Sequence, residues 1–162
     1  MGMRVKSTKI GDLFEVKISE TEKRYIQYIV SDMTQLNCDV IRAFRKKYSI
    51  DSNPSIEEIV NDEVDFYAHC ATKLGIKMGC WTLYGNSQNV GEFNSILFRC
   101  TSDHGGGISE KWYVWHINEE TKHVGKLEGE NRKAELGLAF SPLSIVNRLR
   151  EGKLVGVYPT FA

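Results

Sequence analysis

The chain has 162 residues, with 21 Lys and Arg against 21 Asp and Glu, so its formal net charge is zero. This balance excludes a protein that is strongly basic or strongly acidic throughout, and with it whole-chain attraction to nucleic acid or to a membrane surface. With 41% apolar and 26% charged residues, the composition predicts a folded chain rather than a disordered one. The length fits one domain, and we expect residues 1–162 to form it.

Alternation of apolar and polar residues with a period of two predicts most of the strands. A short turn at 118–121 would let the two strands beside it pair as a hairpin. In chain order the expected strands are 13–18, 25–30, 38–44, 64–70, 96–100, 112–117, 122–127 and 154–158.

Two helices interrupt this strand pattern. The first begins near Ser55, and either Asn53-Pro54 or Ser55 with Glu58 can supply its N-cap. The second covers about 141–151, with Pro142 at its first position and Gly152 at the left-handed site after its end. These elements predict an α+β fold, in which about two helices pack against a strongly curved, mostly antiparallel sheet or a partly open barrel.

The cysteines and the N-terminus bear on compartment. Cys38, Cys70, Cys80 and Cys100 contain no C-x-x-C pair, so their spacing does not indicate zinc. No signal peptide and no apolar run of membrane-spanning length is visible. We therefore expect reduced cysteines in a cytoplasmic protein, without a metal or a cofactor.

The sequence contains no recognisable catalytic motif. Gly105–Gly107, beside Asp103 and His104, lacks the residue order of a phosphate-binding loop and is interpreted as a flexible hairpin connection. An enzyme would have to bring His69, His104 or a cysteine together with acidic residues in a pocket. We expect no catalytic residues and no enzymatic activity.

The position of the charges is more informative than their total. Residues 1–50 carry 10 basic and 6 acidic side chains, residues 51–110 carry 3 and 9, and residues 111–162 carry 8 and 6. The partial charges are therefore +4, −6 and +2, which sum to zero. The negative block is either a solvated helix face or a patch for a basic partner. Its candidate partner-binding residues are Glu57, Glu58, Asp62 and Asp65.

Three aromatic side chains are further candidates for partner binding. Tyr67 shares a strand face with Asp65 and His69, in a polar stripe. Trp112 and Trp115 point to opposite faces of one strand, so one of them could lie exposed as an interface anchor. The alternative is that both indole rings pack in the core.

Several short motifs follow one another in a characteristic order. They are Gly11-Asp12-Leu13-Phe14-Glu15-Val16, Ser55-Ile56-Glu57-Glu58-Ile59-Val60, Val64-Asp65-Phe66-Tyr67, Gly79-Cys80-Trp81, Tyr84-Gly85-Asn86 and Trp112-Tyr113-Val114-Trp115. This order resembles a family of bacterial polymorphic-toxin immunity proteins, the immunity protein 26 family. The resemblance covers about residues 8–118, and we expect the helix and strand at 141–158 to belong to the same domain.

The resemblance implies a stoichiometric inhibitor encoded beside a toxin, with a cognate toxin domain as its protein partner and no catalytic residues. An acidic face could then meet a basic toxin surface. The alternative is a module that binds a small ligand or single-stranded nucleic acid through exposed strand aromatics. Nucleic acid usually requires a basic stripe, and the only candidate is the short run of Arg42, Arg45, Lys46 and Lys47.

Overall fold

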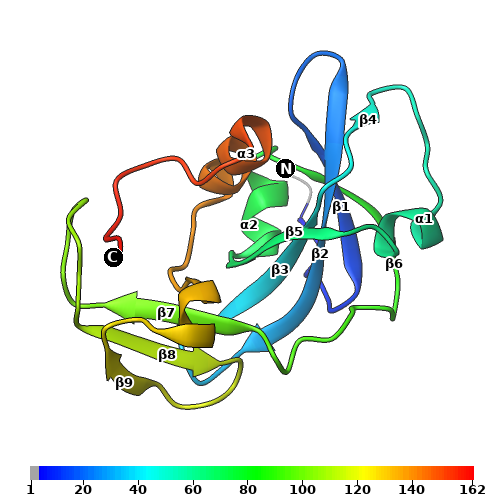
Figure 1. Ribbon diagram of the computed structural model, residues 1–162. Coiled ribbons are helices and arrows are strands. Elements are labelled where there is room, and N and C mark those ends of the chain that lie inside the picture. The colour runs from blue at the N-terminus through cyan, green and yellow to red at the C-terminus, as the bar shows by residue number, and fades with distance from the viewer. Residues whose placement is uncertain (1–3) are drawn as a thin grey trace.

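The computed structural model describes residues 4–162, and its strands form two curved sheets (Figure 1). The larger sheet, sheet A, has the strand order β5-β3-β2-β1-β6, with β4 paired to β2. All of its pairings are antiparallel. Its strands are β1 (Asp12–Lys17), β2 (Glu22–Asp32), β3 (Cys38–Phe44), β4 (Tyr48–Ser49), β5 (Val64–His69) and β6 (Thr82–Asn86).

The smaller sheet, sheet B, has the order β10-β7-β8-β9. The pairs β7–β8 and β8–β9 are antiparallel, and β10 joins β7 in parallel over two residues. The hairpin predicted around the turn at 118–121 is confirmed and is formed by β8 and β9. Asn118 in its turn adopts the left-handed region, with φ 64°. Its strands are β7 (Leu97–Thr101), β8 (Trp112–His116), β9 (Lys122–Gly125) and β10 (Glu135–Leu136).

The structure confirms the α+β class and the curved, mostly antiparallel strands. The strands are divided between two sheets, and neither closes into a barrel. Both predicted helices are present with their predicted caps. The side chain of Ser55 accepts from the backbone N–H of Glu58 at the start of α1 (Ile56–Val60). Pro142 begins α3 (Pro142–Glu151), which Gly152 ends at φ 74°.

Two short helical segments were not predicted. Helix α2 (Thr72–Lys77) has six residues including a glycine, so neither its length nor its helix propensity distinguishes it from a loop. The 3₁₀ helix η1 (Gly129–Lys133) is polar throughout and buries none of its residues. Helices α2 and α3 lie next to each other above sheet A, while η1 lies beside sheet B (Figure 1).

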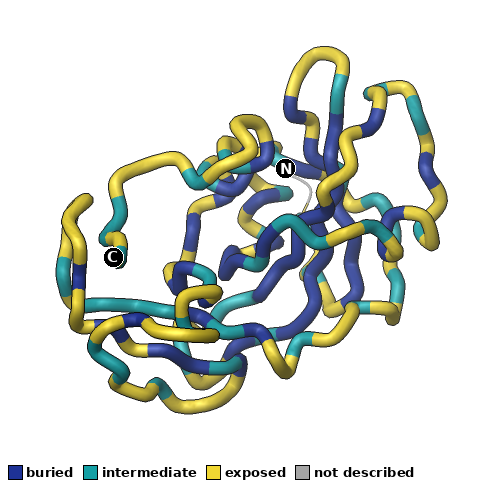
Figure 2. The backbone as a smooth tube through the Cα atoms, viewed as in Figure 1, coloured by how far each residue is buried: buried dark blue, intermediate teal, exposed yellow. Residues whose placement is uncertain are grey.

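The main hydrophobic cluster joins the two ends of the chain. It contains Phe14 of β1, Phe66 of β5 and Trp112 of β8, together with Ile145 and Leu149 of α3. The central strands are buried while the loops and the outer helix faces are exposed (Figure 2). The C-terminal helix α3 therefore shares its core with the first strand.

The strand expected at 154–158 is absent, and this prediction was wrong. Gly156 has a φ of 128°, and Val155 and Val157 are exposed. The segment has no neighbouring strand to pair with, and only Thr160 forms a single bridge, to Ile108. Apolar alternation alone does not make a strand where no sheet edge supplies the hydrogen-bond partners.

Candidate functional site

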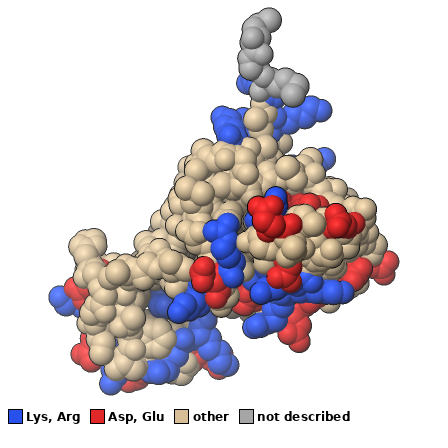
Figure 3. All heavy atoms as spheres, turned by 90° about the horizontal axis from the view of Figure 1, so that it is seen from above, with Lys and Arg blue, Asp and Glu red and all other residues tan. Residues whose placement is uncertain are grey.

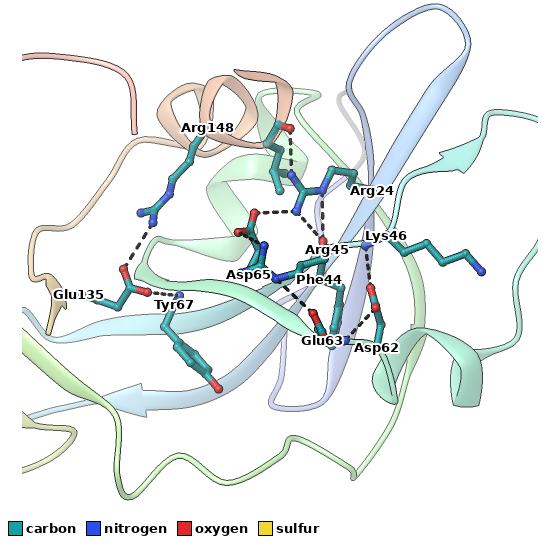
Figure 4. Close-up of polar contacts among 11 residues, drawn as sticks. Arg24, Phe44, Arg45, Lys46, Asp62, Glu63, Asp65, Tyr67, Glu135 and Arg148 are labelled. Carbon is teal, nitrogen blue, oxygen red and sulfur yellow. Dashed lines mark hydrogen bonds and ion pairs between the residues drawn. The ribbon is translucent and has the colours of Figure 1, made fainter. Parts of the chain in front are cut away.

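Several acidic side chains near α1 contact donors within the chain, and Figure 4 draws these contacts for Asp62, Glu63 and Asp65. Glu58 Oε1 lies 2.7 Å from Lys46 Nζ, and Asp62 Oδ2 accepts a hydrogen bond from the backbone N–H of Lys46 over 2.8 Å. Glu57 is exposed and has no ion pair in the part of the chain described. The predicted acidic face is therefore much less negative than its sequence indicates.

Asp65 contacts two arginines, the buried Arg24 and the exposed Arg45. Its Oδ2 lies 2.9 Å from Arg24 Nη2, and its Oδ1 lies 3.6 Å from Arg45 Nη1. The Arg24 side chain is 3% exposed and also donates to the backbone carbonyl oxygens of Phe44 and Leu149. A buried guanidinium needs a carboxylate partner, so the first role of Asp65 is to stabilise Arg24.

The basic run and the acidic block neutralise each other because of the strand register. Strands β3 and β5 are antiparallel neighbours in which Phe44 faces Val64, so Arg45 and Lys46 lie beside the acids of 57–65. Arg42 is buried and donates to Gln27 and to the carbonyl oxygen of Asn89. Seen from above, Lys and Arg side chains lie beside Asp and Glu side chains rather than forming a patch of one sign (Figure 3).

Neither tryptophan of β8 is exposed, so of the two alternatives the packing of both indole rings in the core is the one observed. Trp112 is fully buried and Trp115 is 3% exposed. They do point to opposite faces of the strand, but both faces of sheet B are covered. Trp112 packs in the main cluster, and Trp115 packs in a second cluster with Val30, Val40 and Phe98.

The polar stripe of Asp65, Tyr67 and His69 on β5 is partly exposed and partly buried. His69 is fully buried, with Nε2 2.9 Å from Oδ2 of the equally buried Asp32. Its burial lowers the pKa of His69 below the ordinary value, although Asp32 opposes that shift. Tyr67 is half-buried, and its side chain reaches a groove on sheet B.

This groove has a volume of about 790 Å³ and is the candidate binding site. It lies beside η1, on the face of sheet B that carries Leu97, Val114 and His116, which the β7–β8 register places on one side. Its remaining walls come from the β8–β9 turn, β9, β10 and the segment before β7. The lining residues are Tyr67, Glu92, Ser95, Ile96, Leu97, Val114, Trp115, His116, Glu119, Glu120, Lys122, Val124, Glu130, Asn131, Lys133 and Glu135.

Glu135 is the most firmly held acid of the groove (Figure 4). Its Oε1 accepts a hydrogen bond from the backbone N–H of Tyr67 over 3.3 Å, and its Oε2 lies 3.5 Å from Arg148 Nη2. Burial raises the pKa of Glu135 above its ordinary value, and Arg148 opposes this rise. The contacts from β5 and α3 fix the carboxyl group at the wall of the groove.

The charge of the groove is negative. Five glutamates and two lysines line it, which gives a net charge of −3 with His116 neutral. Glu130 and Lys133 pair with each other over 3.1 Å. Glu119 and Glu120 are exposed in the β8–β9 turn, and no ion pair involves either of them among residues 4–162. Together with Glu92, which is also exposed and in no ion pair within this range, they supply the free negative charge.

Sequence reasoning did not identify this site. Two consecutive acids in the 118–121 turn were a detectable signal, because a hairpin turn leaves its side chains in solvent. Glu135 had no signal, since it reaches Tyr67 only through the parallel β10–β7 pairing and the position of β5. Of the candidates named from the sequence, only Tyr67 and Trp115 are among the residues that line the groove.

A second, smaller cavity of about 300 Å³ brings together Cys100, Asp103 and His104. This is the grouping an enzymatic site would need. However, burial raises the pKa of the Cys100 thiol, which disfavours the nucleophilic thiolate. Asp103 Oδ2 accepts from the hydroxyl of Ser109, and its Oδ1 lies 3.6 Å from Lys111 Nζ. These contacts do not form the nucleophile–base–acid chain of covalent catalysis.

Gly105–Gly107 belongs to the loop from β7 to β8, as predicted for a hairpin connection. All four cysteines are free thiols, and only Cys70 is fully buried. Across residues 4–162, no group of three or more His, Cys, Asp and Glu side chains is placed to hold a metal ion. In the same range, no helix combines the length and the apolarity needed to cross a bilayer.

Comparison of the chain with protein-family models, with curated proteins and with solved structures finds no match in any of the three. The resemblance to the immunity protein 26 family therefore stays a prediction based on the order of its motifs.

Proposed function

We propose that this chain is a non-enzymatic immunity protein, which binds a cognate bacterial toxin domain in the cytosol and neutralises it. The order of the sequence motifs supports the family, and the acidic groove of sheet B supports the mode of action. The groove is the single observation that carries the proposal, because it combines an open volume of about 790 Å³ with a net charge of −3. The proposed site lies on sheet B and not at α1, where Glu58 and Asp65 already have basic partners.

The molecule is large enough for this role. Its accessible surface is 9157 Å². A standard protein interface takes about 800 Å² from each partner, which is less than a tenth of that surface. The groove, the β8–β9 turn and η1 together could form the centre of such an interface. Complementary charge there would raise the rate of association with a basic partner and select against acidic ones.

The test is neutralisation by the gene pair. The toxin domain encoded next to this protein should stop growth when expressed alone and permit growth when co-expressed with it. The purified domains should form a 1:1 complex, and inhibition should reach its endpoint at one equivalent, as a stoichiometric inhibitor requires. A neighbouring gene product that is not toxic, or is toxic and not bound, would overturn the proposal.

The alternative was a module that binds a small ligand or single-stranded nucleic acid through exposed strand aromatics. The two tryptophans that could stack bases are buried, and a groove with a charge of −3 repels phosphate. Only Tyr113 of β8 is partly exposed, at 37%. We therefore expect no salt-dependent binding to single-stranded DNA or RNA. An electrophoretic mobility shift assay at low and high salt tests this expectation.

A further inference from the structure

The groove of sheet B combines an apolar floor with acidic walls. The floor is formed by Leu97 of β7, Val114 of β8 and Val124 of β9. The walls carry Glu119 and Glu120 from the β8–β9 turn, and Glu130 and Glu135 from the segment after β9. A purely apolar ligand would satisfy only the floor, and an anionic ligand would be repelled by the walls.

We propose that this groove receives a lysine or arginine side chain from an exposed segment of a protein partner. Long basic side chains have an apolar methylene stem and a charged end. The stem would pack on Leu97, Val114 and Val124, while the charge would pair with Glu119 or Glu120. A lysine or arginine side chain thus matches the floor and the walls at once.

The charges around the groove are not equally available. Glu130 is paired with Lys133, and Glu135 contacts Arg148. Glu119 and Glu120, in contrast, have no ion pair within the described chain, so a bound cation would not have to displace an internal partner. Lys122, which lines the same groove on β9, is the positive charge that opposes such a ligand.

The size of the groove favours a segment of a macromolecule over a small amine. At about 790 Å³ it lies in the upper part of the range of ligand pockets, roughly 300–1,000 Å³. It also extends to the exposed acids of the turn and to η1, so a chain that delivers the side chain could contact both. The partner is identified by this chemistry, and only its identity as a toxin rests on the proposed function.

The experiment uses the full chain and a defined probe, a fluorescently labelled hexa-arginine peptide, with hexa-glutamate as the negative probe. Fluorescence anisotropy at low salt measures the dissociation constants. The groove variant is E119Q/E120Q. The matched control is D51N/E57Q, which removes two exposed acids on and before α1 and leaves the groove unchanged. Circular dichroism and thermal melting verify that all variants fold like the parent chain.

We expect the groove variant to weaken hexa-arginine binding at least about threefold, since two exposed charge pairs are lost, and the control to change it little. A third variant, K122Q, should tighten binding, because it removes the opposing charge. Binding should also weaken with added salt. Equal effects of the two double variants, no tightening by K122Q, or no binding of the peptide would overturn the inference.

Parallel measurements on the neighbouring toxin domain separate this inference from the proposed function. If the toxin is neutralised equally well by the parent chain and by E119Q/E120Q, the groove inference fails and the immunity function stands. If the peptide binds with the expected pattern but no toxin is bound, the immunity function fails and the groove remains a site for a basic partner.

Discussion

The indole of Trp115 on sheet B donates a hydrogen bond to the carboxylate of Asp32 on sheet A, with Nε1 2.9 Å from Oδ2. The same oxygen lies 2.9 Å from Nε2 of His69, and Oδ1 accepts from the backbone N–H of Asn118 over 3.1 Å. Burial would raise the pKa of Asp32, but these hydrogen bonds lower it below its ordinary value. One buried carboxylate therefore joins the ends of β2, β5 and β8.

Replacing this carboxylate should strongly destabilise the fold. D32A leaves the buried donors of Trp115 and His69 without an acceptor, and we expect a loss of about 3 kcal/mol or more in the free energy of unfolding. Urea denaturation measures this loss. D51A, at an exposed position, is the control and should change stability by less than about 0.5 kcal/mol. A loss of less than about 1 kcal/mol in the unfolding free energy of D32A would contradict the role of Asp32 in joining β2, β5 and β8.

Acid should destabilise the protein through His69. The pKa of His69 is lowered by burial in the folded state, so below its ordinary value of about 6.5 the unfolded chain takes up a proton that the folded chain does not. The stability from this group is complete above pH 6.5 and falls as the pH drops toward the folded pKa, by at most about 1.4 kcal/mol per pH unit. Asp32, whose folded pKa is lowered, adds a further loss below about pH 4.

This pH dependence is measured by urea unfolding at pH 7.5 and pH 5.5. H69Q should be less stable at pH 7.5 and should lose less stability on acidification than the parent chain. H123Q is the control, because His123 is exposed on β9. If the parent and H69Q lose the same amount between the two pH values, His69 is not the titrating group.

Replacing Gly75 of α2 by alanine should lower the stability of the fold, although alanine has the higher helix propensity. Ala is preferred over Gly inside a helix by about 1 kcal/mol. A Cβ at Gly75, however, would overlap the indole ring of Trp81, which is buried and donates from Nε1 to the carbonyl oxygen of Thr72. We therefore expect G75A to destabilise the fold by about 1–3 kcal/mol in thermal or urea unfolding.

The control for G75A is G107A, since no atom lies within 4 Å of a Cβ built at Gly107. It should be nearly neutral. A stabilising effect of G75A would mean that Trp81 does not pack against the helix as described.

Two of the ion pairs in the acidic block should differ in strength. The side chains of Lys46 and Glu58 are both about half exposed, at 52% and 46%, so solvent screens their attraction and E58Q should change the unfolding midpoint little. Asp65 pairs with the buried Arg24, so D65N should cost more, about 2–3 kcal/mol. Equal unfolding midpoints for the two variants would show that Arg24 does not depend on Asp65.

Local patterns in the sequence were enough for most of the secondary structure. Period-two alternation placed seven strands close to their observed positions, and Ser55, Pro142 and Gly152 marked helix boundaries through interactions within a few residues. The same alternation failed at 154–158, because a strand also needs a neighbour. Helix α2 was missed because six residues with a glycine carry no signal of their own.

The amino-acid sequence alone determined that the chain folds as α+β, where α1 and α3 begin, and that its charge is unevenly distributed. Only the tertiary structure decided what those charges do. The β3–β5 register sets Arg45 and Lys46 against the acids of α1, and the covering of both faces of sheet B buries Trp112 and Trp115. One groove is lined by Glu119, Glu120 and Glu135, because segments that are separate in the sequence are neighbours in space. No local sequence pattern encodes that proximity.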